Sequence, residues 1–324
     1  MKAIVYHEYG PPDVLKCEEI EKPFPKDDDV LIRVRAASVN PLDMLFRGKP
    51  YLVRIMTGLR KPKNPRAGVD VAGQVEAVGR NVTQFKPGDE VFGASPGAFA
   101  EYACARESKL ALKPDNVTFE QAATAPVAAS TALQGLRDKG KIQPGQKVLV
   151  NGAAGGVGTF AVQIAKSFGS EVTGVCSARN VDMVRSIGAD HVIDYTQADF
   201  TKGGQRYDLI FDLIGNHSFA ERRRVLTPNG ICVMAGLGGA GQHPESWGRF
   251  AVSLKAALWS RFVREKFVIF MAKVNREDLT ILSELMATGR VTPVIDKRYE
   301  LNQVAEAIRY LEQGHARGKV VIAI

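Results

Sequence analysis

A glycine-rich turn stands in the stretch VLVNGAAGGVG, with Gly152, Gly155 and Gly158 at three-residue intervals. An apolar strand pattern precedes the turn and a helical pattern follows it, which is the setting of a phosphate-binding loop. Because glycine has no side chain, the backbone can approach a pyrophosphate, and the unpaired N–H groups that begin the helix attract anions. The turn predicts a dinucleotide site rather than only a tight strand-to-helix connection. The residues expected to contact the cofactor are Ala154, Gly155, Gly156 and Val157.

A second polar stretch, CSARN, follows the next predicted strand. A site for NAD usually has Asp or Glu there, about twenty residues after the glycines, to bind the ribose. Here Ser177 and Arg179 occupy the region. A guanidinium can pair with a 2′-phosphate and a hydroxyl can donate to it, so the stretch favours NADPH over NADH, unless Arg179 is simply exposed. Tyr195, after the third strand, could stack on adenine or be an ordinary surface tyrosine.

The composition is that of a globular protein of about two domains, with 324 residues, 45% of them hydrophobic and 24% charged. The formal net charge of +8 fits a basic solvated surface or attraction of a phosphate-rich ligand. The basic residues are dispersed and no nucleic-acid motif occurs, so we expect no nucleic-acid partner.

The four cysteines are far apart and form no CxxC pair, which disfavours disulfides and a Cys-rich zinc site and suits a reducing compartment. The first residues lack the apolar segment and cleavage site of a secretion signal, and no apolar run is long enough to span a bilayer. We therefore expect a cytoplasmic protein. Residues 250–274 are aromatic and basic and could form an interfacial helix, but such a pattern is more often core or a dimer contact, so membrane association is not expected.

The elements that must position these residues fall into two groups. The first third of the chain has short strand patterns separated by Pro, Gly and Asp turns, typical of a mostly β unit. From Lys147 strands and helices alternate, which predicts βαβ units and a parallel sheet. The predicted strands are Val148–Asn151, Glu171–Cys176, His191–Ile193, Leu209–Asp212 and Ile231–Ala235, and two of the predicted helices are Val157–Phe168 and Val181–Ile187. The chain ends in GKVVIAI, a buried-strand pattern.

Ten motifs together resemble the medium-chain dehydrogenase/reductase superfamily, in its zinc-independent quinone oxidoreductase and enone reductase branch of the zeta-crystallin type. The motifs are ASVNPLD, GVDVAGQVEAVG, FKPGDEVFG, GAFAEY, STALQGL, NGAAGGVG, CSARN, GADHVIDY, DLIG and GKVV. The resemblance implies an α/β protein with a GroES-like β-barrel catalytic domain, residues 1–122 and 273–324. It also implies a Rossmann domain with a doubly wound parallel sheet, residues 123–272. The cofactor would lie in the cleft between them, and homodimers are typical.

Zinc-dependent members of the superfamily hold a catalytic metal with cysteine and histidine side chains. At the matching positions this chain has Asn40, Val69, and alanine at Ala128 or Ala129. The four-cysteine structural lobe is also absent, because GASPGAFAEYACARES contains only Cys104. We therefore expect no metal, and alcohol dehydrogenation by the zinc mechanism is disfavoured.

The resemblance also implies roles for residues around the nicotinamide. Asn40 would lie near the nicotinamide and the substrate, unless it is only a turn residue, with Asp43 ordering its loop. Tyr51 is the nearest tyrosine able to donate to a substrate oxygen, although relatives often carry the tyrosine at a different position. Further cofactor contacts would be Thr131, Leu237 and Lys319, the last of which could instead be a solvated strand-edge lysine. The basic residues 52–66 could form a lid or a solvated loop.

Without a metal, the hydride must go to an acceptor that needs less activation. Quinones and α,β-unsaturated carbonyl compounds qualify, because their conjugated systems accept hydride at carbon while charge develops on a distant oxygen. The sequence thus predicts an NADPH-dependent, zinc-free reductase of such compounds. Two alternatives remain: a 2-alkenal or enone reductase with little quinone activity, and a non-catalytic NADPH-binding sensor or interaction protein.

Overall fold

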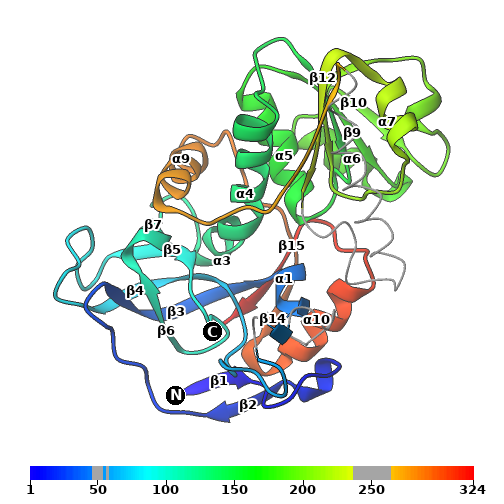
Figure 1. The fold of residues 1–324 in the computed structure, drawn as a ribbon. Coiled ribbons are helices and arrows are strands. Elements are labelled where there is room, and N and C mark those ends of the chain that lie inside the picture. Colours follow the sequence, from blue (N-terminus) through cyan, green and yellow to red (C-terminus); the bar gives the residue numbers. More distant parts are fainter. Residues whose placement is uncertain (46–53, 56–57, 236–263) are drawn as a thin grey trace. The chain divides into compact units, whose positions relative to one another are not determined.

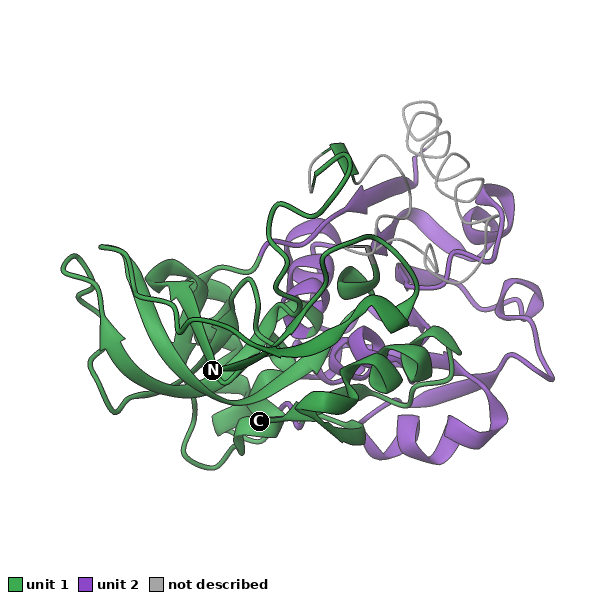
Figure 2. Ribbon diagram, turned by 90° about the horizontal axis from the view of Figure 1, so that it is seen from below, with its two compact units in different colours: residues 1–128, 274–289, 293–324 green, residues 129–273, 290–292 purple. Residues whose placement is uncertain are grey.

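The computed structural model describes residues 1–45, 54–55, 58–235 and 264–324, and its chain divides into two compact units (Figure 2). Unit 1 comprises Met1–Ala128, Val274–Gly289 and Pro293–Ile324, and unit 2 comprises Ala129–Lys273 and Arg290–Thr292. The sequence predicted domain boundaries after residues 122 and 272. The first change of unit falls instead after residue 128, inside helix α4 (Ala125–Leu133), in which Pro126 stands at the start.

Unit 1 contains a seven-stranded sheet and a separate antiparallel pair, labelled in Figure 1. The pair is β1 (Lys2–Val5) and β2 (Lys16–Glu19), and the sheet strands are β3 (Asp29–Val39), β4 (Asp70–Val78), β5 (Glu90–Ala94), β6 (Tyr102–Arg106), β7 (Leu110–Leu112), β14 (Ile295–Glu300) and β15 (Lys319–Ala323). The order is β14-β15-β3-β4-β5-β7, with β6 also paired to β3. Strand β15 pairs antiparallel with β3, which confirms that the terminal GKVVIAI is a strand and returns to the first unit.

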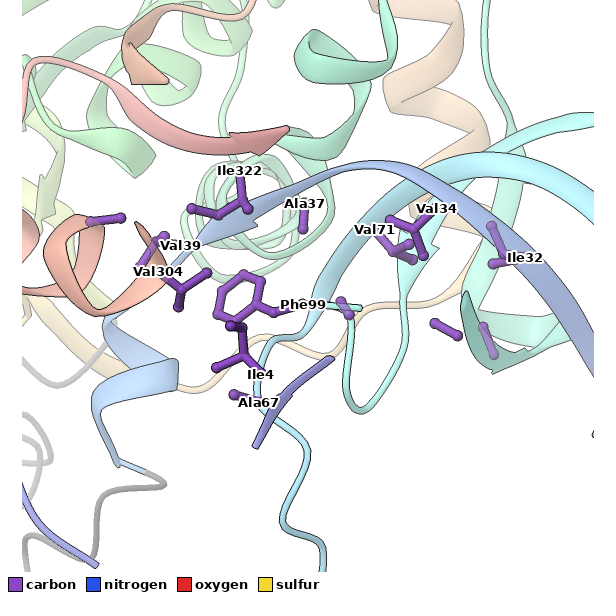
Figure 3. Packing of buried hydrophobic residues seen from close by; sticks show 14 of the residues in the cluster. Ile4, Ile32, Val34, Ala37, Val39, Ala67, Val71, Phe99, Val304 and Ile322 are labelled. Carbon is purple, nitrogen blue, oxygen red and sulfur yellow. The ribbon is translucent and has the colours of Figure 1, made fainter. Parts of the chain in front are cut away.

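The core of unit 1 collects apolar side chains from distant parts of the chain (Figure 3). Phe99 packs among residues that include Ile4, Val304 and Ile322. The α-helices whose bounds lie within the described residues of this unit, besides the first part of α4, are α1 (Pro41–Leu45), α3 (Phe119–Ala123), α9 (Arg276–Ala287) and α10 (Val304–Glu312). Helix α10 buries Val304, Ala307 and Ile308, a three-and-four spacing that places them on one face.

Strand β3 alternates buried and exposed side chains along its middle, as a half-covered strand should. Its last four residues, 36–39, are all buried, so the strand enters a dry region as it reaches Asn40. The polar residues at this end must therefore satisfy their hydrogen bonds within the protein.

Unit 2 is built on a six-stranded parallel sheet with the order β10-β9-β8-β11-β12-β13. The strands are β8 (Lys147–Asn151), β9 (Glu171–Cys176), β10 (His191–Asp194), β11 (Tyr207–Asp212), β12 (Leu226–Ala235) and β13 (Lys266–Phe270). This is the doubly wound order, with its switch point between β8 and β11. The five strands predicted from the alternating pattern are confirmed, although β11 and β12 begin earlier than expected.

Among the described residues, the α-helices of this unit besides the last part of α4 are α5 (Gly156–Ser167), α6 (Val181–Ser186) and α7 (Phe219–Arg224). The two predicted helices are confirmed within one residue at each end. Helix α5 packs against β8 and β9 through an almost continuous buried stretch, 158–165. Helix α7 begins with a capping box, in which the Ser218 hydroxyl accepts from the N–H of Glu221 while the Glu221 carboxylate accepts from the N–H of Ser218.

Within the described part of the chain, no helix is both long enough and apolar enough to cross a membrane. Most of the aromatic and basic segment, 250–263, lies outside the described residues, and its end forms β13.

Candidate functional site

Asn40 lies between the end of β3 and the start of α1, and only 2% of it is exposed. Its backbone N–H donates to Oδ2 of Asp43 over 2.8 Å, and the N–H of Asp43 donates back to the carbonyl of Asn40 over 3.0 Å. These two bonds close a tight turn, so Asp43 orders the loop as the sequence predicted.

The Asn40 side chain is held from both ends by charged groups on neighbouring strands. Its Nδ2 donates to Oδ2 of Asp70 on β4 over 2.8 Å, and its Oδ1 accepts from Nζ of Lys319 on β15 over 2.6 Å. A carboxylate can only accept and an ammonium can only donate, so these partners determine which end of the amide is nitrogen. The Lys319 ammonium donates in addition to the carbonyl of Val39 over 3.1 Å. Three adjacent strands therefore place one amide in a single orientation.

Asp70 is fully buried and anchors this cluster. Besides Asn40 it accepts from the Ser38 hydroxyl over 2.8 Å and from the backbone N–H of Val127 over 3.0 Å, and Lys319 lies 3.5 Å away. Burial raises the pKa of Asp70 and lowers the pKa of Lys319, while their attraction opposes both shifts. With four donors around it, Asp70 is the carboxylate that balances the buried ammonium.

Asp43 is the second buried carboxyl of the cluster, and burial raises its pKa to about 7. The negative charge of Asp70 adds to the shift, whereas the N–H of Asn40 and the charge of Lys319 oppose it. Its Oδ2 accepts from the N–H of Asn40, whereas its Oδ1 has no hydrogen-bond partner within the described residues. Burial raises the pKa of Tyr6 to about 12, and the negative charge of Asp43 adds to that shift, so Tyr6 stays neutral.

The glycine turn of unit 2 connects β8 to α5. Gly152 has a φ of +92°, a conformation that favours glycine, and a Cβ on Gly158 would stand 2.0 Å from the carbonyl oxygen of Gly152. Gly155 is the residue before the helix, and no side chain of the described residues caps the helix start. The first N–H groups of α5 are thus left for an outside acceptor, which is the arrangement that a pyrophosphate requires.

The residues predicted to bind the 2′-phosphate and the adenine lie at the carboxyl ends of β9 and β10, which are neighbours in the sheet. Ser177 and the exposed Arg179 follow β9, and Tyr195, 61% exposed, follows β10. The N–H of Tyr195 donates to the carbonyl of Cys176 over 3.0 Å, and Nδ2 of Asn180 donates to the Ser177 hydroxyl oxygen over 3.1 Å. The structure therefore brings the three predicted residues to the sheet edge that carries the glycine turn.

Other predicted site residues are placed differently. Thr131 is a buried residue of α4 within unit 2. Tyr51 and Leu237 lie outside the described residues, as does most of 52–57 in the basic loop. Sequence reasoning did not assign roles to Ser38 and Asp70 in this cluster. The signal available for Asp70 was a carboxylate inside the apolar strand pattern GVDVAG.

Over residues 1–45, 54–55, 58–235 and 264–324, no group of three or more His, Cys, Asp or Glu side chains is arranged to hold a metal ion. Where zinc-dependent members carry a cysteine ligand, the Asn40 amide is engaged by an ammonium and a carboxylate. The donor set around Asn40 therefore does not fit a zinc ion.

Two family models match this chain. A model described as "Alcohol dehydrogenase GroES-like domain" matches residues 26–115, and one described as "Zinc-binding dehydrogenase" matches residues 187–322. Among curated proteins, the chain is 36% identical to the tomato (Solanum lycopersicum) 2-methylene-furan-3-one reductase and 37% identical to the Arabidopsis thaliana chloroplastic NADPH-dependent alkenal/one oxidoreductase. Each alignment covers 99% of this chain and 79% of the relative.

Solved structures show the same likeness. The quinone oxidoreductase from Coxiella burnetii superposes with a TM-score of 0.86 at 30% identity, over 100% of this chain and 99% of that one. The Escherichia coli quinone oxidoreductase complexed with NADPH gives a TM-score of 0.83 at 25% identity, over 100% of both chains. The chain therefore belongs to the medium-chain dehydrogenase/reductase superfamily, in the group of the quinone and alkenal oxidoreductases.

Proposed function

We propose that this protein is an NADPH-dependent reductase that transfers hydride to quinones or α,β-unsaturated carbonyl compounds without zinc. The observation that carries the proposal is the engagement of Asn40 Oδ1 by the Lys319 ammonium, 2.6 Å away, at a position where zinc-dependent members hold their metal. A site with that donor set favours an acceptor that needs no Lewis acid. Conjugated carbonyls and quinones are such acceptors.

The cofactor assignment rests on the fit of unit 2 to NADPH. The start of α5 would bind the pyrophosphate, Ser177 with Arg179 would bind the 2′-phosphate, and Tyr195 would stack on the adenine. Two related proteins support the choice by name: the Arabidopsis relative is NADPH-dependent, and the Escherichia coli structure is a complex with NADPH. Bound NADPH would supply the hydride. Thr131, Leu237 and Lys319 remain proposed contacts to it.

The hydrogen bonds of Asn40 limit what its amide can do in the reaction. One Nδ2 hydrogen is directed to Asp70, the other to the carbonyl of Ser38 over 3.4 Å, and one Oδ1 lone pair is used by Lys319. The amide keeps one acceptor lone pair for an N–H or O–H of a bound ligand. Asn40 therefore acts as an acceptor and an orienting group, and the proton that completes the reduction comes from another group. Tyr51 remains the proposed donor.

One alternative within this chemistry is a reductase of alkenals and enones with little quinone activity. It is favoured by the names of the tomato and Arabidopsis relatives, which are a furanone reductase and an alkenal/one oxidoreductase. The other alternative is a protein that binds NADPH without turning over any acceptor.

A substrate panel distinguishes these possibilities. NADPH and NADH oxidation is measured with a benzoquinone, a 2-alkenal and an alkenone, with Asn40→Ala as the matched variant. We expect turnover of at least one class with NADPH preferred, and a lower turnover number in the variant with little change in NADPH affinity. Tight NADPH binding without turnover of any acceptor would contradict the enzymatic proposal and support the sensor alternative.

We also propose that the protein is a cytoplasmic homodimer. Its four cysteines are free thiols, which suits a reducing compartment, and the dimer rests on the resemblance to its superfamily. Light scattering during gel filtration tests the dimer. Metal analysis after purification without added zinc tests the zinc-free proposal, for which we expect no stoichiometric zinc.

A further inference from the structure

A buried ion pair in unit 2 lies outside the residues assigned so far. Arg222 of α7 is the largest of the fully buried side chains in the described residues, and its Nε donates to Oδ2 of Asp212 over 2.7 Å. The two side chains are 1% and 0% exposed. The free energy needed to remove two charges from water is about as large as the free energy gained from their attraction. Two apolar side chains of similar volume would therefore stabilise the fold equally well. Nη1 of Arg222 even lacks a partner within the described residues, so the pair suggests a role other than stability.

Asp212 uses its other oxygen to tie together the ends of two neighbouring strands. It is the last residue of β11, and its Oδ1 accepts from Nδ2 of Asn151, the last residue of β8, over 2.9 Å. The same oxygen accepts from the backbone N–H groups of Ile214 and Gly215 over 3.1 and 2.9 Å. The carboxylate thus fixes the backbone that follows β11 against the residue that precedes the glycine turn.

The segment held in this way, residues 213–216, packs on the glycine turn itself. A Cβ added to Gly152 would stand 2.9 Å from the end of the Ile214 side chain. Oδ1 of Asn216 accepts from Nδ2 of Asn151 over 3.0 Å, which closes a second tie between the segment and β8. Arg222 supports this arrangement, because it holds Oδ2 of Asp212, the oxygen that the N–H groups of Ile214 and Gly215 do not use.

The order of the sheet says which part of a dinucleotide would meet this segment. Strands β8, β9 and β10 lie on one side of the switch point and carry the glycine turn, Ser177, Arg179 and Tyr195. Strand β11 is the first strand on the other side of the switch point. A dinucleotide bound to a doubly wound sheet extends across the switch point, from one half of the sheet to the other. With the adenosine half over β9 and β10, the nicotinamide half lies at the end of β11.

We propose that Asp212 and Arg222 are positioning residues for the nicotinamide half of NADPH, because they hold residues 213–216 at the switch point of the sheet. The proposal rests on the NADPH site proposed above. It concerns the orientation of the segment and assigns no direct contact between the ion pair and the cofactor.

The test compares two ligands on two variants. NADPH spans the switch point, whereas 2′,5′-ADP contains only the adenosine half and its phosphates. Arg222→Met removes the cation and leaves Asp212 with three N–H donors. Arg223→Met is the matched control, because Arg223 is the next residue of the same helix and its side chain is 48% exposed, paired with Glu265.

Dissociation constants are measured by calorimetry with the full chain. For Arg222→Met we expect NADPH affinity to fall roughly tenfold or more while 2′,5′-ADP affinity changes less than about twofold. Arg223→Met should bind both ligands as the wild type does. An unchanged NADPH affinity in Arg222→Met overturns the proposal. An equal loss of affinity for both ligands also overturns it, because that result would show that the substitution disturbs the whole sheet.

A second variant decides the matter if Arg222→Met does not fold. Asn151→Ser leaves the ion pair in place but cuts the ties of β8 to Asp212 and Asn216, and we expect the same selective loss of NADPH affinity. Unchanged NADPH affinity in Asn151→Ser overturns the proposal. Because binding is measured, a wild type that turns over no acceptor leaves the test intact. A wild type that binds neither nucleotide overturns the cofactor assignment and this proposal together.

Discussion

At the scale of single residues, the cluster around Asn40 buries three ionisable side chains, Asp43, Asp70 and Lys319, away from water. Lys319 and Asp70 form an ion pair beside Asn40, and among the described residues Asp43 has no salt-bridge partner. Burial raises the pKa of the Asp43 carboxyl to about 7, so this group gains or loses its proton near neutral pH. The residue Arg179 differs from these groups, because it is exposed and its guanidinium can reach a ligand in solvent.

Asp43→Asn should change how stability depends on pH. The pKa of Asp43 is raised to about 7 in the folded protein from an ordinary value of 3.8, so folding favours the protonated form. The folded state therefore loses stability as pH rises from about 4 to 7, by a total on the order of 4 kcal/mol. Asparagine stays neutral and can still accept from the N–H of Asn40. Urea unfolding should show that the variant gains stability relative to wild type at pH 8 and not at pH 4.

The control is Asp182→Asn, an exposed aspartate at the start of α6. It should leave the difference in unfolding free energy between pH 4 and pH 8 as it is in the wild type. An Asp43→Asn variant whose pH dependence matches the wild type would show that Asp43 is ionised at neutral pH.

Arg179→Ala should weaken NADPH binding far more than NADH binding. A hydrogen bond to a charged group contributes about 1.5–3 kcal/mol, which corresponds to a loss of roughly ten- to a hundredfold for the 2′-phosphorylated cofactor. Titration of both nucleotides measures the ratio, with the exposed Arg185→Ala on α6 as the control. Equal losses for both cofactors would remove the argument for a 2′-phosphate site.

At the scale of elements, strand ends do most of the positioning. Asn40 follows β3, Asn151 ends β8 and Asp212 ends β11, and each is held by bonds to a neighbouring strand. The glycine turn depends on the same principle, because α5 can start directly behind β8 only if its backbone passes close to Gly152. Gly158 is consequently needed for the close packing of the turn, whereas Gly155 leaves space for a ligand.

Gly158→Ala and Gly155→Ala should distinguish the effect of the turn on stability from its effect on NADPH affinity. A Cβ on Gly158 would clash with the backbone of the turn, whereas a Cβ on Gly155 meets only the Gly152 oxygen at 3.5 Å and otherwise points into open space. We expect Gly158→Ala to lower stability by about 1–3 kcal/mol. Gly155→Ala should keep the wild-type melting temperature and lose NADPH affinity, because its methyl group occupies space that a pyrophosphate needs. Calorimetric melting and NADPH titration measure both, and a destabilised Gly155→Ala would contradict the assignment.

At the scale of the whole molecule, the two ends of the chain depend on each other. Strand β15 lies between β14 and β3, and residues 319–322 are all buried. The last segment is therefore an interior strand of unit 1 and carries Lys319 to the Asn40 cluster.

Removal of residues 318–324 should prevent unit 1 from folding, because it opens the sheet between β3 and β14 and leaves Asp70 without its cation. We expect insoluble protein, or soluble protein with reduced strand content by circular dichroism. Removal of Ile324 alone, which follows the strand, is the control and should leave the fold intact. A soluble, native-like truncated chain would contradict the central place of β15.

Much of the architecture could be predicted from the sequence because the signals are local. The alternation from Lys147 onward identified five of the six strands of the parallel sheet, and the glycine spacing identified the turn before α5, since periodicity and glycine act within a few residues. The alternation missed β13, because Lys266–Phe270 lies in an aromatic and basic segment that was not predicted as a strand. Boundaries were less certain, as the early starts of β11 and β12 show.

The sequence by itself determined that a mostly β unit and a parallel βαβ sheet are present, and it determined the glycine turn, because these signals lie within short stretches. The assignment of Ser177 and Arg179 to a 2′-phosphate stays a prediction from the sequence. Only the tertiary structure decided how Asn40 is held. Lys319 is 279 positions away from Asn40 in the chain and Asp70 is 30 positions away, and both reach Asn40 because β15 and β4 pair with β3. The same holds for Arg222 and Asp212, whose meeting depends on the packing of α7. The physical reason is that the partners of a buried charge are set by which strands and helices pack together and in which register. A pattern within one short stretch of sequence does not specify that packing.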